Sequence, residues 1–228
     1  MATTLRMISS MATRQLLVEL IASHEQAGGV PVALESVGGV DAARRVEAGE
    51  PFDVVVLAAD AIDKLIASGR IVLGRVDLVR SGVAVAVRAG APLPDIASED
   101  AVREAVLGAR SLSYSTGPSG VHLMRVFERW GIAAQIQGRI VQAPPGVPVG
   151  SLVARGEVEL GFQQLSELIH LPGIAVVGPL PPAIQIVTVF SAGIAATSTQ
   201  AGAVRALLDF MVSPAAADAK RRNGLDPA

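Results

Sequence analysis

Short apolar runs rich in β-branched residues alternate with amphipathic segments along most of this 228-residue chain. In its first third, the runs predicted as strands cover residues 5–8, 30–35 and 53–57. Residues 13–25, 41–48 and 61–67 between them place apolar side chains three or four positions apart, which is typical of helices that bury one face. Strands that alternate with helices predict a parallel sheet covered by helices on both faces.

The pattern changes in the middle of the chain, where two long apolar strands are predicted at residues 82–87 and 184–190, each bordered by Pro or Gly. The strand–helix series between them comprises residues 99–107 behind the N-cap Ser98, then 111–115, 119–130, 136–142, 150–155 and 160–162. A strand at 194–196, a helix at 201–211 and a short helix at 215–222 close the chain. This order predicts a lobe made of residues 1–81 and 188–228, an inserted lobe of residues 82–187, and a hinge formed by the two long strands.

Composition removes several classes of function. The formal net charge is -2 and only 3% of residues are aromatic, so neither a basic patch nor a stacking platform for nucleic acid is expected. The chain has no cysteine, which excludes disulfides and thiolate chemistry. No apolar run approaches the length of a membrane span, and no metal-ligand spacing or P-loop is present, so we expect no membrane insertion, cofactor or metal.

The first residues leave two locations open. Residues 1–4 lead directly into the first predicted strand, without the basic and apolar regions of an export signal. The protein is cytoplasmic if Met1 is the native start, and periplasmic if a signal peptide has been removed.

Four strand-to-helix junctions carry small or hydroxyl residues, at positions 9–14, 36–39, 115–120 and 144–147. Such junctions leave backbone N–H groups uncovered at the positive end of a helix, and several together favour a small anion. The alternative is that they are ordinary helix starts. The candidate ligand-binding residues are Ser9, Ser10, Arg14, Gly38, Gly39, Ser115, Thr116, Ser119, Gly120, Gly146 and Val147.

A family resemblance covers almost the whole chain. Six segments carry it: residues 9–14, 43–49 (Ala-Arg-Arg-Val-Glu-Ala-Gly), 53–60, 118–120, 152–157 and 161–162. They resemble type II periplasmic binding proteins, and above all the molybdate-binding proteins of ABC transporters. Residues 207–213 and 224–227 resemble the C-terminus of that family. The resemblance implies a two-lobed α/β fold, with a mainly parallel sheet flanked by helices in each lobe. It also implies a monomer, a small-anion ligand and, if the protein is exported, an ABC permease as partner.

Departures from the family pattern change the expected ligand. The family resemblance implies that two serines and usually a tyrosine hold the oxyanion. In our alignment Ala12 occupies the position of the first serine, Gly38 or Gly39 that of the second, and Gln164 that of the tyrosine. Each hydrogen bond left unmade in a buried site costs about 1–3 kcal/mol, which argues against molybdate or tungstate. Open glycines admit a larger ligand, and the Arg14 guanidinium suits a carboxylate. We therefore expect an organic di- or tricarboxylate.

Two classes of function remain open. A solute-binding subunit would capture the anion and deliver it to a permease. An enzyme on the same scaffold would isomerise a polycarboxylate by proton transfer, as aconitate isomerases related to the molybdate-binding family do. The candidates for the general base are His122, Tyr114, Glu35 or a water molecule, and we favour His122. We favour the enzyme narrowly; His24 and His170 are expected on the surface.

Overall fold

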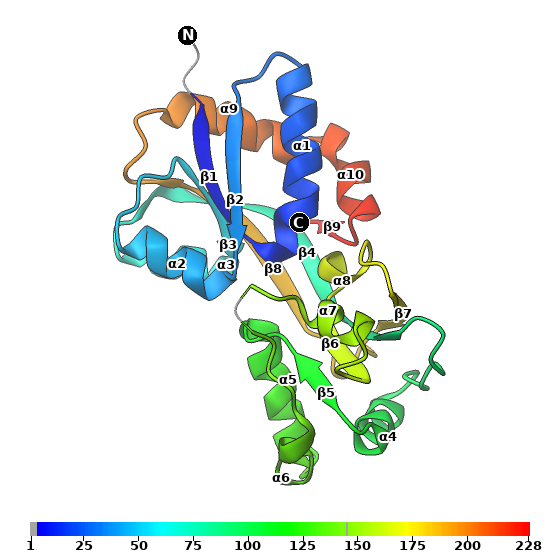
Figure 1. Ribbon diagram of the computed structural model, residues 1–228. Helices are drawn as coiled ribbons and strands as arrows, with labels where there is room; N and C mark the ends of the chain where they lie inside the picture. Colours follow the sequence, from blue (N-terminus) through cyan, green and yellow to red (C-terminus); the bar gives the residue numbers. More distant parts are fainter. Residues whose placement is uncertain (1–3, 145) are drawn as a thin grey trace. The chain divides into compact units, whose positions relative to one another are not determined.

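The structure is a computed structural model that describes residues 4–144 and 146–228 (Figure 1). It falls into two compact units, one formed by the chain up to Ser81 and again from Thr188, the other by Gly82–Val187. The strand β4, Ile71–Arg88, passes from the first unit into the second.

The sheet of the first unit is built around β1. Its strands β1 (Leu5–Ser10), β2 (Val32–Val37), β3 (Val54–Ala58) and β8 (Val187–Ala195) follow the order β2-β1-β3-β8, and β8 is followed by β4. β1 pairs in parallel with both β2 and β3, whereas β8 runs antiparallel to β3. The short β9, Asp226–Pro227, pairs with β4.

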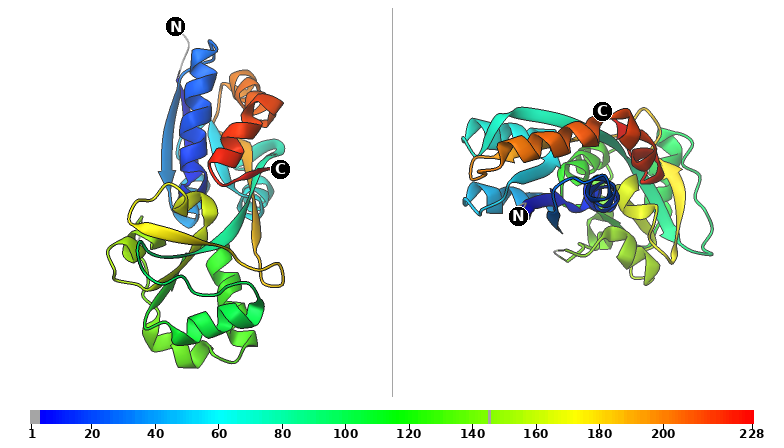
Figure 2. Two further views of the ribbon diagram at one scale, coloured as in Figure 1. Left: turned by 90° about the vertical axis from the view of Figure 1, so that its right-hand side faces the viewer. Right: turned by 90° about the horizontal axis from the view of Figure 1, so that it is seen from above.

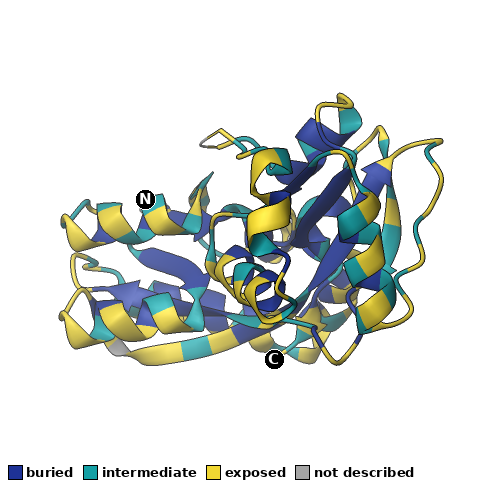
Figure 3. Ribbon diagram, turned by 90° about the horizontal axis from the view of Figure 1, so that it is seen from below, coloured by how far each residue is buried: buried dark blue, intermediate teal, exposed yellow. Residues whose placement is uncertain are grey.

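Helices cover both faces of this sheet because its strands are apolar on both sides (Figure 3). Leu5, Met7 and Val54 pack with one helix group, whereas Ile8 and Val55 pack with the other. The first group is α1 (Arg14–Gln26), α9 (Ala201–Val212) and α10 (Ala217–Arg222), and Figure 2 shows α1 beside α10. The second group is α2 (Gly39–Glu47) and α3 (Ala59–Ala67). The 3₁₀ turns Met11–Thr13 and Pro214–Ala216 precede α1 and α10.

The second unit has its own sheet and core. β5 (Leu112–Tyr114) pairs in parallel with β6 (Leu160–Gln164), and the end of β4 runs antiparallel to β6 and to β7 (Ile174–Pro179). Phe127 packs edge-on against Phe162 at 6.3 Å between ring centroids, in a core shared with Leu112 and Val85. The helices are α4 (Glu99–Gly108), α5 (Pro118–Arg129), α6 (Ala133–Ile136), α7 (Val149–Ala154) and α8 (Leu165–Leu168), with a 3₁₀ turn at Gln137–Arg139.

The expected alternation of strands and helices is confirmed, with several local errors. Residues 71–81, to which no element was assigned, begin the long strand β4. The sheet of the second unit is not mainly parallel as expected, because β4 runs antiparallel to both β6 and β7. Residues 136–142 form the end of α6, a 3₁₀ turn and a single bridge at Ile140 rather than a regular element, because they are not paired along their length. The strands predicted at 184–190 and 194–196 are one continuous strand, β8, which begins at Val187. β7 was not predicted, although Ile174, Val176 and Val177 form a β-branched run that is typical of a strand.

None of the helices in the described part of the chain is both long and apolar enough to cross a membrane.

Candidate functional site

Two predicted junctions of the first unit lie at the same edge of its sheet. β1 and β2 run in parallel with Ser9 opposite Ser36 and Ser10 opposite Val37, so both strands end together. α1 begins just after β1, and α2 begins at Gly39 just after β2. The register therefore brings Ser9, Ser10, Gly38 and Gly39 together, at the carboxyl edge where α/β sheets bind ligands.

Ser10 has the unusual side chain at this edge. Its residue is 6% exposed, and its Oγ has no hydrogen-bond partner among the described residues. A Cβ added to Gly39 would lie 3.6 Å from the Cβ of Ser10, so the hydroxyl-bearing residue adjoins the N-terminus of the nine-residue helix α2. Buried polar atoms are normally satisfied, so an orphan hydroxyl beside a helix N-terminus indicates a place for an external acceptor.

The other candidates of this junction behave differently from Ser10. The Oγ of Ser9 lies 2.8 Å from the Oγ of Ser36, so its hydrogen-bonding capacity is used inside the sheet edge. Ala12 is buried in the 3₁₀ turn and offers no side-chain donor. Arg14 is the first residue of α1, is exposed, and makes no ion pair with a described side chain, which leaves its guanidinium available.

The first junction of the second unit is tightly packed. The Oγ atoms of Ser115 and Ser119 lie 2.8 Å apart, and Gly120 sits so close to this turn that an added Cβ would be 1.6 Å from the carbonyl oxygen of Ser115. Gly117 is the N-cap of the twelve-residue helix α5 and provides no side chain to cap it. Thr116 and His122 are exposed beside this helix start.

The remaining candidates of the second unit are positioned by β6, at the carboxyl edge of that unit's own sheet. The parallel register pairs Tyr114 with Phe162, so the residues after β5 lie beside the end of β6 and Gln164. Gly146 and Val147 lead into α7, whose Gly150 N–H donates to Gln163 Oε1 at 3.1 Å. Pro145, part of this predicted junction, lies outside the described residues.

Glu167 was missed by sequence reasoning. Gln163 Nε2 donates to its Oε2 at 2.6 Å, and burial raises the pKa of the Glu167 carboxyl to about 7, although the Gln163 hydrogen bond acts in the opposite direction. The i,i+4 spacing of Gln163 and Glu167 around the end of a strand was the available signal, but nothing in the sequence indicates that this carboxyl is buried. An acid with a pKa near neutral can both accept and donate a proton under physiological conditions.

The other candidate bases are less suited to this task. Burial raises the pKa of Tyr114, whose hydroxyl donates to the Sδ of Met124. Hydrogen bonding to Arg45 lowers the pKa of Glu35, which weakens it as a base. His24 was expected on the surface, and this is wrong: it is 8% exposed, because its ring packs against Phe210, 5.5 Å away between centroids.

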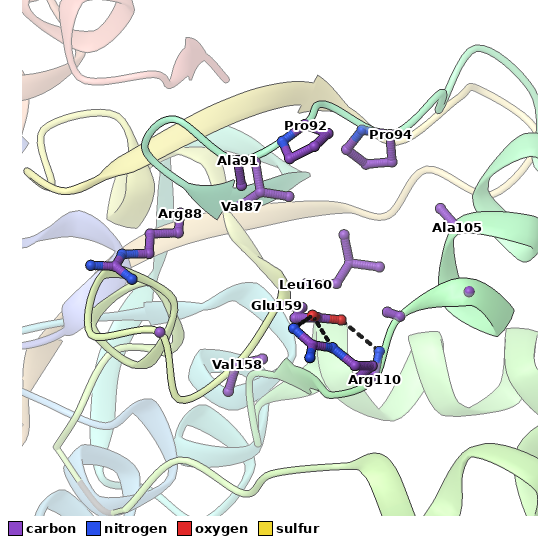
Figure 4. Close-up of a pocket in the computed structure, with 13 residues that line it drawn as sticks. Val87, Arg88, Ala91, Pro92, Pro94, Ala105, Arg110, Val158, Glu159 and Leu160 are labelled. Carbon is purple, nitrogen blue, oxygen red and sulfur yellow. Dashed lines mark hydrogen bonds and ion pairs between the residues drawn. The ribbon is translucent and has the colours of Figure 1, made fainter.

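A cavity of about 380 Å³ lies at the opposite end of the second unit's sheet (Figure 4). Arg110, just before β5, and Glu159, just before β6, form an ion pair in its wall, and Arg110 Nε donates to Glu159 Oε1 at 2.5 Å. The described residues that line it include none of the predicted ligand-binding residues. It is therefore separate from the edge at which β5 and β6 end.

Comparison with known proteins identifies the family of this chain. The model of the bacterial extracellular solute-binding protein family matches residues 5–226. The chain belongs to this family. It is 41% identical to a protein named aconitate isomerase from Pseudomonas sp, over 99% of the chain and 88% of that relative.

Solved structures agree on the fold. The periplasmic molybdate-binding protein of Azotobacter vinelandii has a TM-score of 0.80 at 22% identity, with 98% of this chain and 99% of that one covered. A tungstate ABC transporter structure from Geobacter sulfurreducens has a TM-score of 0.74 at 19% identity, covering 95% and 97%. The predicted resemblance to molybdate-binding proteins and to aconitate-isomerase-like relatives is confirmed, and so is the α/β binding-protein fold class.

Proposed function

We propose that this solute-binding protein family member binds an organic di- or tricarboxylate and isomerises it by proton transfer. The observation that carries the proposal is the 41% identity, over nearly the whole chain, to a relative named aconitate isomerase. The residues support an organic acid, since Ala12 and Gln164 replace the serine and tyrosine that the resemblance to oxyanion-binding relatives would require.

Each unit supplies one place for a carboxylate in this proposal. In the first, the Ser10 hydroxyl and the N-terminus of α2 provide donors, and Arg14 provides a positive charge. In the second, the start of α5 with Ser115 and Ser119 provides the donors. Helix N-termini and hydroxyls stabilise carboxylates by hydrogen bonds to their charged oxygens, which are stronger than those between neutral groups.

A transport role is the second candidate. The structural neighbours that bind molybdate or tungstate share the fold, and the family is described as extracellular. In that role the protein would capture a small anion and present it to an ABC permease. The unpartnered Ser10 hydroxyl would serve an inorganic oxyanion as well as a carboxylate.

A thermal-shift screen distinguishes the two functions. We expect cis- and trans-aconitate or related tricarboxylates to raise the melting temperature, and molybdate, tungstate and sulfate to leave it unchanged. A ligand at 100 times its Kd adds about 2.7 kcal/mol of stability, which the melting curve resolves. NMR of the mixture then follows conversion of the acid. A shift with molybdate or tungstate and none with the organic acids would contradict the proposal and support the transport role.

Replacing Ser10 by alanine tests the first carboxylate site. Losing a hydrogen bond to a charged oxygen costs about 1.5–3 kcal/mol, so the Kd for the acid should rise roughly 10- to 100-fold. The melting temperature of the free protein should not fall, because the substitution removes a buried hydroxyl that has no partner. Calorimetric titration and thermal melting measure the two effects. Ser23→Ala on the exposed side of α1 is the control, since the Ser23 hydroxyl bonds the carbonyl of Glu19 within that helix. An unchanged Kd for Ser10→Ala would rule out this donor.

A further inference from the structure

The cavity in the second unit lies away from every residue used in the proposed function. Its volume of about 380 Å³ falls within the roughly 300–1,000 Å³ of small-molecule sites. β5 and β6 run in parallel, so Arg110 and Glu159, which precede them, mark the amino edge of this sheet. Ser115 and Gln164 stand at the carboxyl edge, where these strands end. The cavity is therefore a second place at which this unit can hold a ligand.

Apolar side chains form most of the cavity wall, and the chain around them is held in place. These lining residues are Val87, Ala91, Pro92, Pro94, Ala105, Ala109, Val158 and Leu160. The loop that carries the two prolines is fastened at its start, where the Ala89 N–H donates to the Gly173 carbonyl oxygen at 3.0 Å. At the end of α4, Arg139 Nη1 donates to the carbonyl oxygens of Leu107 at 2.9 Å and Ala109 at 2.6 Å. Because proline also restricts the backbone, the wall is preformed and a ligand loses little free energy in ordering it.

The ion pair in the wall presents hydrogen-bond donors that are oriented but unused. Glu159 Oε1 accepts from Arg110 Nε at 2.5 Å and pairs with Nη2, while Oε2 accepts from the Arg110 backbone N–H at 2.6 Å. These contacts fix the guanidinium by its Nε edge, and its Nη1 group makes no hydrogen bond with a described residue. Figure 4 shows this pair on one side of Leu160, with Pro92 and Pro94 on the other. A guanidinium can only donate, so a ligand must bring the acceptor.

Arg88 makes the cavity net positive. It forms no ion pair with a described side chain, and a Cβ added to Gly156 would lie 3.3 Å from its Nη1, so it rests on the turn before β6. The charged residues among the described lining are Arg88, Arg110 and Glu159, which gives the cavity a formal charge of +1. Hydrogen bonding to Arg110 lowers the pKa of Glu159, so this carboxyl stays ionised at neutral pH. An anion is therefore favoured over a cation.

We propose that this cavity binds a small monocarboxylate with an apolar body, of the aromatic or branched-chain type. The carboxylate accepts from Arg110 Nη1, Arg88 supplies the excess positive charge, and the body packs on Val87, Leu160 and the prolines. A single negative charge matches the net charge of the cavity. The further carboxylates of a polycarboxylate would lie against apolar walls, where a charge is costly to bury. The ligand class thus differs from that of the proposed function.

Calorimetric titration of the full chain tests the ligand class. The probes are naphthalene-2-carboxylate, benzoate and 4-methylpentanoate, and the uncharged comparison is naphthalene-2-carboxamide. We expect the naphthalene acid to bind at least about tenfold more tightly than its amide, because only the acid offers a charged acceptor. Equal affinity of acid and amide would overturn the assignment of an anion site. Absence of binding by all three acids would overturn the site altogether.

Two substitutions test the arginines. Arg110→Met removes the oriented donors and should raise the Kd for naphthalene-2-carboxylate about tenfold or more, and Arg88→Met should raise it by a smaller factor. Arg125→Met is the matched control, since Arg125 is an exposed arginine of α5 in the same unit that does not line the cavity. Its Kd should stay within twofold of wild type. An unchanged Kd in Arg110→Met, or an equal rise in Arg125→Met, would contradict the proposal.

NMR of the wild-type protein locates the ligand without any substitution. Naphthalene-2-carboxylate should shift the amide signals of Gly108, Gly156 and Glu159 and leave those of Ser10 and Gly39 in place. Shifts confined to the carboxyl edges of the two sheets would overturn the site, as would a Kd that rises in Ser10→Ala. Failure of the isomerase proposal would leave these expectations unchanged, because none of them depends on binding or turnover of a polycarboxylate.

Discussion

Gly120→Ala is expected to unfold the second unit. An added Cβ at this position would lie 1.6 Å from the carbonyl oxygen of Ser115 and 2.8 Å from its carbonyl carbon. These are backbone atoms, so relief requires α5 to move away from the end of β5 rather than a side chain to rotate. α5 carries Phe127 and Leu123 into the core of this unit, so its displacement disrupts that core. We expect a loss of more than about 4 kcal/mol in the free energy of unfolding.

The measurement is urea unfolding followed by tryptophan fluorescence. Trp130 is the single tryptophan of the chain and packs against Phe127 at 5.8 Å between centroids, so it reports on the second unit. Gly108→Ala is the control, because it lies at the exposed end of α4 with no atom within 4 Å of an added Cβ. That substitution should be neutral or stabilise by about 0.4–1 kcal/mol. Similar midpoints for the two variants would show that the turn at Ser115 adapts.

The second large effect is a pH-dependent loss of stability that depends on Glu167. Burial raises the pKa of this carboxyl from 4.5 to about 7, so between those values the folded protein holds a proton that the unfolded chain has released. Stability falls with pH wherever the folded state binds more protons. The contribution of Glu167 to stability should therefore be highest below pH 4.5 and should decline as the pH rises to about 7. Since each pKa unit corresponds to about 1.4 kcal/mol, the loss amounts to about 3 kcal/mol.

Comparing wild type with Glu167→Gln isolates this contribution, because every other titrating group is common to both. At pH 8 the variant should be more stable than wild type by about 3 kcal/mol, and the difference should shrink toward pH 5. Urea midpoints at several pH values, read from Trp130, measure it. The Glu157→Gln variant should show the reverse sign and a small effect, because its ion pair with Arg155 lowers the pKa of that carboxyl. Parallel pH curves for wild type and Glu167→Gln would show that Glu167 is well solvated.

Much of the fold could be predicted because its information is local. β-branched runs such as 54–58 and the apolar spacing around Leu16 and Leu20 directly reflect burial on two sheet faces. The junction at Ser10 could be predicted for the same reason, since small residues after a strand leave helix N–H groups uncovered. That Ser10 rather than Ser9 keeps an unpaired hydroxyl could not be predicted, because it depends on the β1–β2 register, which places Ser36 opposite Ser9.

Glu167 illustrates what local pattern cannot supply. A carboxylate three residues into a helix is usually solvated, and its burial follows from packing of α8 on β6 and β7, of which β7 itself was not predicted. His24 is the corresponding case in the first unit, buried by the distant α9 through Phe210. In both, the decisive neighbours come from segments remote in sequence.

The discontinuous first unit has a consequence for synthesis on the ribosome. The strand beside β3 is β8, and the apolar face of β1 and β3 is closed by Leu207 and Met211 of α9. Because translation proceeds from the N-terminus, Gly82–Val187 emerges complete and can fold while β3 still lacks a neighbour on one side. The nascent chain therefore exposes an open strand edge and an apolar sheet face until its last forty or so residues appear.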